Sequence, residues 1–395
     1  MAGSSIPKKK WTVKLRVALV IETSSSYGRG LLKGIVRYRQ TNHDWSVFLE
    51  QRDLSATFPA WLTSWKGDGI ISRATTHALA EAVASTRVPL VELTDRSQDF
   101  GFTYVWSNDA SIGKLGAEHL IDRGFDHFAF CGFENEAWSQ RREVAFRETI
   151  QNASHELSDS YRTVLFDKNA GDWEKQQAQL VSWLLALPKP VAIMACNDVR
   201  GQQVIDACSR AHLIVPEQVA VLGVDDDTLL CEICDPPLSS IVPNAELVGF
   251  RGAELLAQEM AGERVTQRQN LIDPIGITHR MSTNTYAVED ADVGKALSFI
   301  RDRACSGIGV DDVARFVGVS RSTLERKLRR YSNRSPQAHI RRIQVGHAQE
   351  LLLTTELPID HIATVCGYEH PEYLHVVFRR ELNMTPGEYR RVNQR

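Results

Sequence analysis

One short pattern of residues occurs twice near the end of this 395-residue chain, and it constrains the fold more than any other feature. The first copy consists of Val313-Ala314, Gly318-Val319, Leu324, Leu328 and Ser335-Pro336, and the second of Ile362-Ala363, Gly367-Tyr368, Leu374, Phe378 and Thr385-Pro386. The copies lie about 50 residues apart and share the intervals from Ala to Gly and from Leu to Pro. In each copy a small Ala permits close approach of two helices, a Gly takes a tight turn, and apolar residues then recur on one helical face. The pattern predicts a helix, a turn and a second helix, twice over.

Two helix-turn-helix units predict DNA binding, because the second helix of such a unit enters the major groove. Two units tied by one helix could read major grooves one helical turn apart, about 34 Å. We expect the main recognition helix at residues 320–329 with Ser320 as its N-cap, and outward-facing side chains in the second unit if Leu374 and Phe378 face inward. The residues predicted to contact DNA are Ser320, Arg321, Ser322, Thr323, Arg326 and Lys327 in the first unit and His370, Glu372, Tyr373 and His375 in the second.

Positive charge is concentrated at the first of these units, although the whole chain carries a formal net charge of −3. Between Arg321 and Arg342 the only acidic residue is Glu325, and the basic residues are Arg321, Arg326, Lys327, Arg329, Arg330, Arg334, Arg341 and Arg342. A basic segment on and after a recognition helix supplies contacts to DNA phosphates. The alternative is a solvated helix face, but the motif around the segment favours phosphate contact.

With these motifs, the segment from about Lys295 to Arg391 resembles the AraC-type regulators. The second repeat of that family ends in an aromatic residue, two basic residues, and Thr-Pro before Tyr-Arg, which here are Phe378-Arg379-Arg380, Thr385-Pro386 and Tyr389-Arg390. Asn333 and Asn383 replace a usual Gly, and Asn is the next-best residue for a left-handed helix C-terminus. Leu374 replaces a usual Phe and Val376 a usual basic residue, so the second recognition helix is expected to make fewer direct contacts than average.

Strand and helix patterns alternate through the first 280 residues, which predicts a parallel α/β architecture of two lobes. Predicted strands include Val17–Ile21, Val47–Leu49, Gly69–Ile71, Val88–Val91, Phe128–Cys131, Thr163–Phe166, Ala192–Met194 and Val219–Val224. Predicted helices include Gly30–Arg39, Thr76–Ser85, Asp109–Arg123, Arg141–Gln151, Trp173–Leu187, Val199–Ala211 and Glu246–Met260. We therefore expect a disordered start at 1–13, a sensor domain at 14–283, a linker at 284–292 and an all-α domain at 293–395.

Ligands bind beyond the carboxyl ends of strands in open α/β sheets, so polar residues at those ends predict a binding site. Charged groups, an amide and an indole suit a sugar, whose hydroxyls accept from Arg and donate to Asp while an apolar sugar face packs on an aromatic ring. The predicted sugar-binding residues are Tyr27, Arg29, Trp106, Trp138, Arg142, Asp198, Asp225 and Asp226. Each has an ordinary alternative, as a helix cap, a turn residue, a core aromatic or a surface charge; their shared location favours the site.

Residues from about Arg16 to Tyr286 resemble the periplasmic-binding-protein fold (type I) of LacI-type regulators. The resemblance rests on Asn197-Asp198 after a strand, Gly223-Val224-Asp225-Asp226 and Pro216-Glu217-Gln218-Val219. A LacI-type sensor ahead of an AraC-type domain is the order found in regulators of xylose operons. The resemblance implies a D-xylose-dependent transcriptional activator with D-xylose contacts at Arg29, Trp138, Arg142, Asp198, Asp225 and Asp226, acting as a homodimer with RNA polymerase as a partner. The segment Thr23–Ser26 differs from that family, and another sugar is the alternative ligand.

Other classes of protein are weakly supported. There is no apolar run long enough for a membrane span and no signal-peptide core, so a cytoplasmic protein is expected rather than a transport component. The seven cysteines are scattered, and Cys231-x-x-Cys234 lacks the second pair of a zinc site. Gly28-x-Gly30 followed by Gly34 misses the dinucleotide-binding spacing, and no nucleophile elbow or phosphate loop is present. Paired carboxylates could suggest a glycosidase, but we expect no enzyme, no metal and no cofactor.

Overall fold

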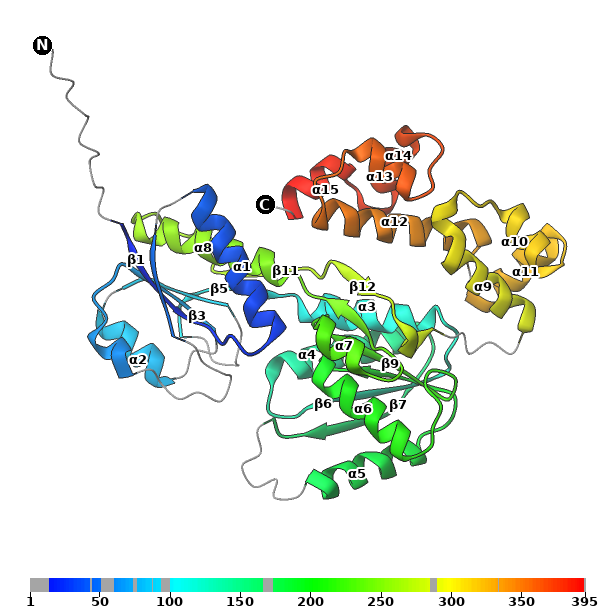
Figure 1. Ribbon diagram of the computed structural model, residues 1–395, viewed down its shortest axis with the longest axis horizontal. Coiled ribbons are helices and arrows are strands. Elements are labelled where there is room, and N and C mark those ends of the chain that lie inside the picture. Colours follow the sequence, from blue (N-terminus) through cyan, green and yellow to red (C-terminus); the bar gives the residue numbers. More distant parts are fainter. Residues whose placement is uncertain are drawn as a thin grey trace, which may run out of the picture. The chain divides into compact units, whose positions relative to one another are not determined.

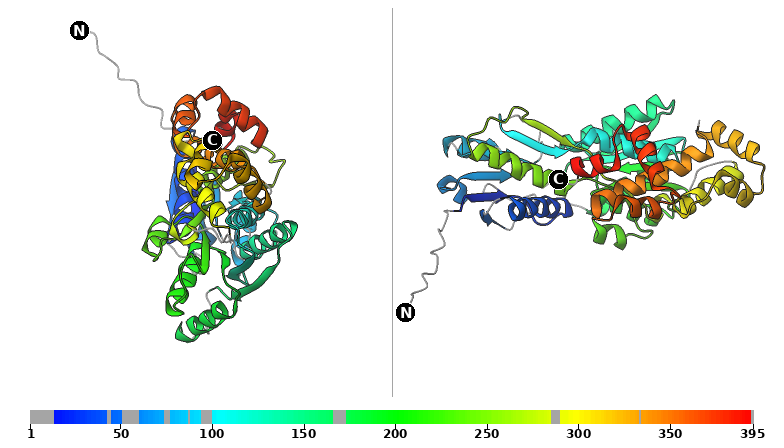
Figure 2. Two further views of the ribbon diagram at one scale, coloured as in Figure 1. Left: turned by 90° about the vertical axis from the view of Figure 1, so that its right-hand side faces the viewer. Right: turned by 90° about the horizontal axis from the view of Figure 1, so that it is seen from above.

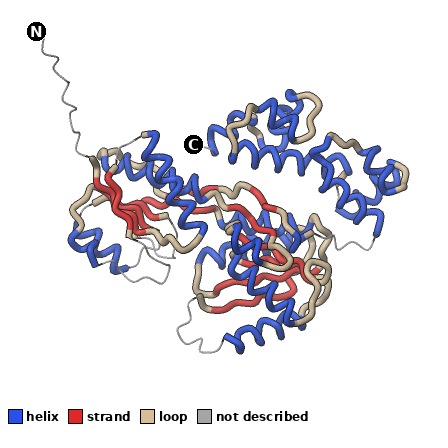
Figure 3. The backbone as a smooth tube through the Cα atoms, in the orientation of Figure 1, coloured by secondary structure: helices blue, strands red, loops and turns tan. Residues whose placement is uncertain are grey.

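The computed structural model of the chain describes residues 14–42, 45–50, 60–73, 77–86, 88–93, 100–165, 173–284, 290–332 and 334–393. Their strands form two six-stranded sheets, and everything described after residue 290 is helix or connection (Figure 1 and Figure 3). The predicted fold class, two α/β lobes followed by an all-α domain with two helix-turn-helix motifs, is confirmed. The predicted disordered start at 1–13 and residues 285–289 of the predicted linker lie outside the described residues.

The chain divides into two compact units, Met1–Trp106 with Val248–Asn270, and Ser107–Leu247 with Leu271–Arg395. The first sheet has the strand order β11-β5-β4-β3-β1-β2. Its strands are β1 (Arg16–Val20), β2 (Ser46–Leu49), β3 (Gly69–Ser72), β4 (Leu90–Glu92), β5 (Thr103–Ser107) and β11 (Gln269–Ile272). The helices of this part are α1 (Ser26–Thr41), η1 (Ala60–Ser64), α2 (His77–Thr86) and α8 (Ala245–Met260). β1 pairs with both β2 and β3 in parallel and is buried along most of its length, as its continuous apolar run predicts.

The second sheet has the order β12-β10-β9-β8-β6-β7 and is parallel except for the pairing of β12 with β10. Its strands are β6 (His127–Phe133), β7 (Leu157–Thr163), β8 (Val191–Ala195), β9 (Val219–Val224), β10 (Ser239–Val242) and β12 (Gly276–Thr278). The accompanying helices are α3 (Asp109–Ile121), α4 (Ala137–Asn152), α5 (Trp173–Ala186), α6 (Asp198–Arg210), α7 (Thr228–Ile233) and the short η2 (Met281–Thr283). Phe128 and Phe130 belong to one core with α3 and α4, whereas Ala129 and Cys131 belong to another with α5 and α6. Successive residues of a strand face opposite sides, so the sheet is covered on both faces.

Several predicted boundaries were wrong, among them the start of α1, which begins at Ser26 and not at the predicted Gly30. The strand predicted at Thr163–Phe166 ends at Thr163, because the polar segment from Leu157 pairs with β6 at the edge of the sheet; Phe166 itself lies outside the described residues. Such an edge strand needs little apolar sequence, and none of its residues is fully buried. α4 begins at Ala137, four residues before the predicted start, and α9 (Ala291–Arg303) begins with Asp290 as its N-cap instead of at Val293.

The C-terminal part of the chain, yellow to red in Figure 2, consists of helices and their connections. The order of these helices confirms both repeats. They are α9, η3 (Ala304–Ser306), α10 (Val310–Val317), α11 (Arg321–Ser332), α12 (Pro336–Thr354), α13 (Ile359–Val365), α14 (Pro371–Leu382) and α15 (Pro386–Asn393). Gly318 and Gly367 take the two turns at φ 84° and 81°, a region that side chains with a Cβ rarely adopt. Asn383 ends α14 at φ 56°, as predicted for a left-handed helix end, while Asn333 lies outside the described residues.

Candidate functional site

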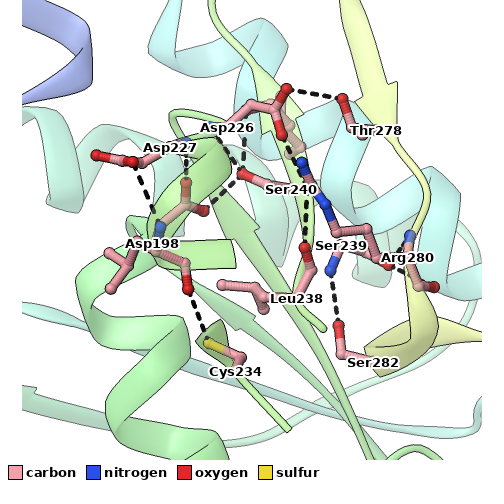
Figure 4. A network of polar contacts seen from close by, with 12 residues as sticks. Asp198, Asp226, Asp227, Cys234, Leu238, Ser239, Ser240, Thr278, Arg280 and Ser282 are labelled. Atoms are coloured by element: carbon pink, nitrogen blue, oxygen red, sulfur yellow. Dashed lines mark hydrogen bonds and ion pairs between the residues drawn. The ribbon is translucent and has the colours of Figure 1, made fainter. Parts of the chain in front are cut away.

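Asp198 lies at the first turn of α6, directly beyond the carboxyl end of β8 (Figure 4). Its carboxylate is 2% exposed and accepts hydrogen bonds from the Ser240 hydroxyl at 2.5 Å and the Asp227 backbone N–H at 2.8 Å. Burial, and after it the charge of Asp225, raises the pKa of Asp198 well above its usual range. The helix cap is its neighbour Asn197, whose side chain accepts from the Arg200 N–H, so the alternative that Asp198 is only a cap does not explain its position.

Asp225 and Asp226 follow β9 and take positive φ angles of 113° and 48°. Non-glycine residues rarely occupy this region, and the strain is kept only where surrounding contacts impose it. Both oxygens of Asp226 are engaged, one by Arg280 at 2.8 Å and the other by the Thr278 hydroxyl at 2.9 Å (Figure 4). Asp226 therefore links the loop after β9 to Thr278 and Arg280, at and just after the end of β12. Its predicted role as a sugar ligand stays a prediction.

Arg142 is 5% exposed and is held on three sides. Its Nε donates to Asp109 at 2.9 Å, its NH1 donates to the Cys196 carbonyl at 2.6 Å, and its guanidinium lies 4.9 Å from the centre of the Trp138 ring. Burial opposes the charge, but Asp109 and Asp225 outweigh it and raise the pKa of Arg142. In this unit the charge of Asp225 acts on both Arg142 and Asp198, and the predicted role of the three residues in sugar binding stays a prediction.

The other predicted sugar residues, Tyr27, Arg29 and Trp106, belong to the first unit. Tyr27 is 8% exposed on α1. Arg29 is exposed, and its NH1 donates to the carbonyls of Ser24 at 2.8 Å and Thr23 at 3.1 Å. Trp106 near the end of β5 is partly buried and meets Tyr104 edge to face at 5.7 Å. Their role in sugar binding is untested and stays a prediction.

Sequence reasoning missed Glu22 and Arg73 in the first unit. Arg73 follows β3 and forms an ion pair with Glu22, which is 3% exposed just beyond β1. The Arg73 guanidinium also lies 4.7 Å from the Tyr27 ring centre and 3.3 Å from the Ser25 hydroxyl. Gly28 makes room for this arrangement, since a Cβ there would lie 2.5 Å from a Glu22 carboxylate oxygen. Both residues stand at strand ends, so the rule used for the predicted site could have found them.

The first recognition helix is α11, and its predicted start is confirmed by the Ser320 hydroxyl, which accepts the Thr323 N–H at 3.2 Å. Leu324 and Leu328 are fully buried, so Arg321, Ser322 and Arg326 remain exposed and Thr323 partly exposed. Arg321 is 56% exposed and shares ion pairs with Glu325 and Asp311, which DNA phosphate would have to replace.

Lys327 is placed differently from its predicted neighbours on α11. Its ammonium lies 2.7 Å from Asp290 and 2.8 Å from Asp292, at the start of α9, and its side chain is 27% exposed. These two carboxylates raise the pKa of Lys327 through hydrogen bonds and charge. The contact fastens α11 to the segment that leads into the helical domain. Its predicted contact with DNA is untested and would require this pair to open.

The second recognition helix is α14, where Leu374 and Phe378 are fully buried as predicted. Consequently His370, Glu372 and Tyr373 are exposed and His375 is partly exposed. α14 carries an acidic residue in its first turn and basic residues only in its last, Arg379 and Arg380. Val376 is 60% exposed where the family usually has a basic residue, which fits the expectation of fewer direct contacts.

Among the described residues, no group of His, Cys, Asp and Glu side chains is arranged to hold a metal ion. Cys231 and Cys234 are both buried free thiols, and burial raises the pKa of Cys234 to about 11 and that of Cys231 further. Such thiols are poor nucleophiles and poor ligands. No described helix has the length and apolar character needed to cross a bilayer.

Models of three protein families match successive parts of the chain. The model described as the XylR N-terminal domain matches residues 16–102, the periplasmic binding protein-like domain matches 117–283, and the helix-turn-helix domain matches 313–392. The order of these matches is that of the two sheets and the helical domain.

Curated relatives resemble the chain over nearly its whole length. The xylose operon regulatory protein of Escherichia coli K12 is 29% identical over 394 residues, which cover 97% of this chain and 98% of that protein. The protein of the same name from Haemophilus influenzae is also 29% identical, over 95% of this chain and 98% of its own length. A solved structure of a xylose-binding transcription activator superposes with a TM-score of 0.61 at 28% identity, over 97% of this chain and 100% of the other. A cellobiose complex of a transcriptional regulator, at 21% identity and a TM-score of 0.55 over 68% of this chain and 84% of its own, shares the sensor fold. The chain therefore resembles the xylose operon regulatory proteins over nearly its whole described sequence, with a periplasmic binding protein-like domain followed by an AraC-type helix-turn-helix domain.

Proposed function

We propose that the chain is a sugar-responsive, sequence-specific DNA-binding transcription regulator, that its ligand is D-xylose and that it activates genes for xylose use. The observation that carries the proposal is the combination, in one chain and over nearly the full length of the relatives, of a sugar-sensor fold with two helix-turn-helix motifs. The relatives are transcriptional regulators, and the absence of enzymatic activity in this chain is part of the proposal.

The chemistry of the second unit supports a small neutral sugar as the ligand. Arg142 is a fixed donor, since Asp109 and the Cys196 carbonyl hold its guanidinium, and hydroxyl oxygens can accept from it. Asp225 carries an acceptor for sugar hydroxyls close to Arg142 and Asp198. The indole of Trp138, positioned by its own hydrogen bond to Glu136 at 2.7 Å, offers an apolar face. Tyr27, Arg29 and Trp106 of the first unit are proposed as further sugar contacts.

A homodimer is the second part of the proposal. α7 carries Leu229 and Ile233, which are 78% and 79% exposed and four residues apart, so they lie on the same side of the helix. Exposed apolar side chains grouped in this way are typical of association surfaces. A second copy of the chain is the proposed occupant. Leu229→Glu should then lower the mass measured by light scattering, and an unchanged mass would reject this surface as the dimer contact.

As an activator, the protein would contact RNA polymerase and act in the cytoplasm, where the DNA is. D-xylose would raise the affinity for paired DNA half-sites, and by linkage the same DNA must raise the affinity for D-xylose by the same factor.

The decisive experiment is calorimetric titration of the full-length chain with D-xylose, L-arabinose, D-ribose and D-glucose. Saturable binding of D-xylose that is lost in Asp225→Asn, and kept in the control Asp206→Asn, whose partly exposed carboxylate pairs with Arg210, would support the ligand and the site together. Asn at position 225 keeps the shape and tolerates the positive φ of 113° better than Ala. Preferred binding of another sugar would change the ligand and keep the architecture. No binding by any of the four would reject the proposed sensor.

A further inference from the structure

One helix, α3, joins the predicted sugar site to the DNA-binding domain. At its first residue, Asp109 is 4% exposed and accepts from Arg142 at 2.9 Å through one oxygen and from Arg141 at 3.0 Å through the other. Along its length α3 lies against α4, the helix that carries both arginines; a Cβ on Gly113 would lie 2.3 Å from the Arg142 carbonyl oxygen. Any displacement of Arg142 therefore acts directly on the first turns of α3.

The other end of α3 holds the DNA-binding domain. Asp122, the C-cap residue, accepts from Arg334 at 2.7 Å through one oxygen and pairs with Arg342 through the other. Glu118, one turn earlier, lies 3.9 Å from the Arg342 guanidinium. Arg334 precedes the cap of α12 and Arg342 lies within α12, the helix that connects the two helix-turn-helix motifs. The Asp122 side chain is 21% exposed, while those of Arg334 and Arg342 are 42% and 36% exposed, so solvent partly screens this double pair.

The same end of α3 also fixes the chain where it leaves the sensor. Arg123 is 7% exposed, and its Nε donates to the Thr283 carbonyl at 2.7 Å. His119 lies 3.1 Å from the Thr283 hydroxyl and stacks on His279, with the ring centres 5.1 Å apart. The residues at the end of α3 thus contact both η2, the last turn of the sensor domain, and α12, the helix that connects the two helix-turn-helix motifs of the DNA-binding domain. A helix fixed at both ends moves as one body of about 20 Å.

We propose that α3 transmits the sugar signal, with Asp122 as the positioning residue that docks the DNA-binding domain through Arg334 and Arg342. This inference rests on the proposed function and deepens it. Sugar bound at Arg142 changes the position of α3, and Asp122 passes that change to α12, which sets both recognition helices relative to each other. Arg334 and Arg342 belong to the basic segment predicted to contact phosphates, so their docking also decides how that segment is presented.

The test compares full-length wild type, Asp122→Asn, Arg342→Gln and the double variant. Asp126→Asn is the matched control, because Asp126 stands four residues later and its side chain is 81% exposed. The first readout is the ratio of operator affinities with and without saturating D-xylose, measured by fluorescence anisotropy on a DNA fragment selected by the wild-type chain from random sequence. The second is hydrogen exchange of the first turns of α12, which reports docking without sugar or DNA.

If the proposal is right, the wild type shows a ratio in the usual range of roughly 5–150-fold, and Asp122→Asn brings it to within about twofold of one. Arg342→Gln gives a similar fall, and the double variant adds nothing further, because both changes break the same pair. Exchange in the first turns of α12 rises in these variants, while Asp126→Asn matches the wild type in both readouts.

Two results would overturn the proposal with the function intact. Wild-type coupling in Asp122→Asn would exclude Asp122 from transmission, and wild-type exchange would exclude the docking itself. If the wild type bound operator DNA with no response to D-xylose, the proposed function and the transmission through α3 would both fall, and hydrogen exchange would still decide the docking. These patterns differ, so the two failures are distinguishable.

Discussion

Gly113 lies where α3 meets the backbone of α4, and replacing it with Ala tests whether this close approach matters. A Cβ built there would lie 2.3 Å from the Arg142 carbonyl oxygen and 3.0 Å from both the Ala145 Cβ and the Phe146 nitrogen. The first of these atoms is backbone and cannot rotate away. The two helices would have to separate by about 1 Å, which is overpacking of a fully ordered contact.

The expected magnitude is a balance of two terms. Overpacking costs about 1–3 kcal/mol, and Ala recovers about 1 kcal/mol of helix propensity relative to Gly. Gly113→Ala should therefore lower the free energy of unfolding by up to about 2 kcal/mol. It should also weaken D-xylose binding, because the displaced backbone carries Arg142 and its pair with Asp109.

The assay is urea denaturation followed by calorimetry with D-xylose, with Gly346→Ala as the matched control. Gly346 is exposed in the middle of α12, and a Cβ there would meet nothing within 4 Å. The same substitution should be stabilising at that position by up to about 1 kcal/mol. If Gly113→Ala proved as stable as the wild type and bound the sugar equally well, the argument from helix contact to ligand affinity would be wrong.

Three further predictions concern pH, a helix cap and a DNA contact. Burial, and after it the charge of Arg334, lowers the pKa of His339 in α12, which is 7% exposed, to about 4, so as pH falls from about 6.5 towards 4 the unfolded chain binds a proton that the folded chain does not. The resulting loss of unfolding free energy, up to about 1.4 kcal/mol per pH unit, should shrink in His339→Gln when urea midpoints are compared at pH 7, 6 and 5; an equal slope in both proteins would contradict the prediction. Ser320→Ala removes the N-cap of α11 and should lower the free energy of unfolding, measured by urea denaturation, by about 1 kcal/mol. The control Ser322→Ala should lower it little, and equal losses in the two variants would show that Ser320 does not cap the helix. Arg326→Ala should weaken operator binding by about 1–3 kcal/mol if the side chain reads a guanine; an equal loss on all DNA sequences would make it a phosphate contact.

The sequence alone determined the helical domain almost completely. Its signals are local: Gly318 and Gly367 at turns, buried Leu324 and Phe378 at helical spacing, and Ser320 as a cap all act within a few residues of the chain. Interactions of such short range depend only on residues that are close in the sequence. The helices and turns predicted from the sequence therefore agree with those of the structure.

The candidate sugar site could be proposed from the sequence as a place in the fold, but the hydrogen-bond partners of its residues could not. Parallel strands bring their carboxyl ends to one edge of the sheet, and the charge of Asp225 at that edge acts on both Arg142 and Asp198. The same rule could have found Glu22 and Arg73. The edge strand β7 was misplaced because its pairing with β6 stabilises a segment with little apolar sequence.

Only the tertiary structure decided which charged groups are used within the protein. Asp226 is held by Arg280, 54 residues away, and Lys327 by Asp290, 37 residues away. Asp122 meets Arg334 across 212 residues of chain. No spacing in the sequence marks these pairs, because they depend on how elements with separate local signals pack together. Burial of apolar side chains drives that packing, and it is not directional. Ion pairs then form between whichever charged side chains the packing brings together.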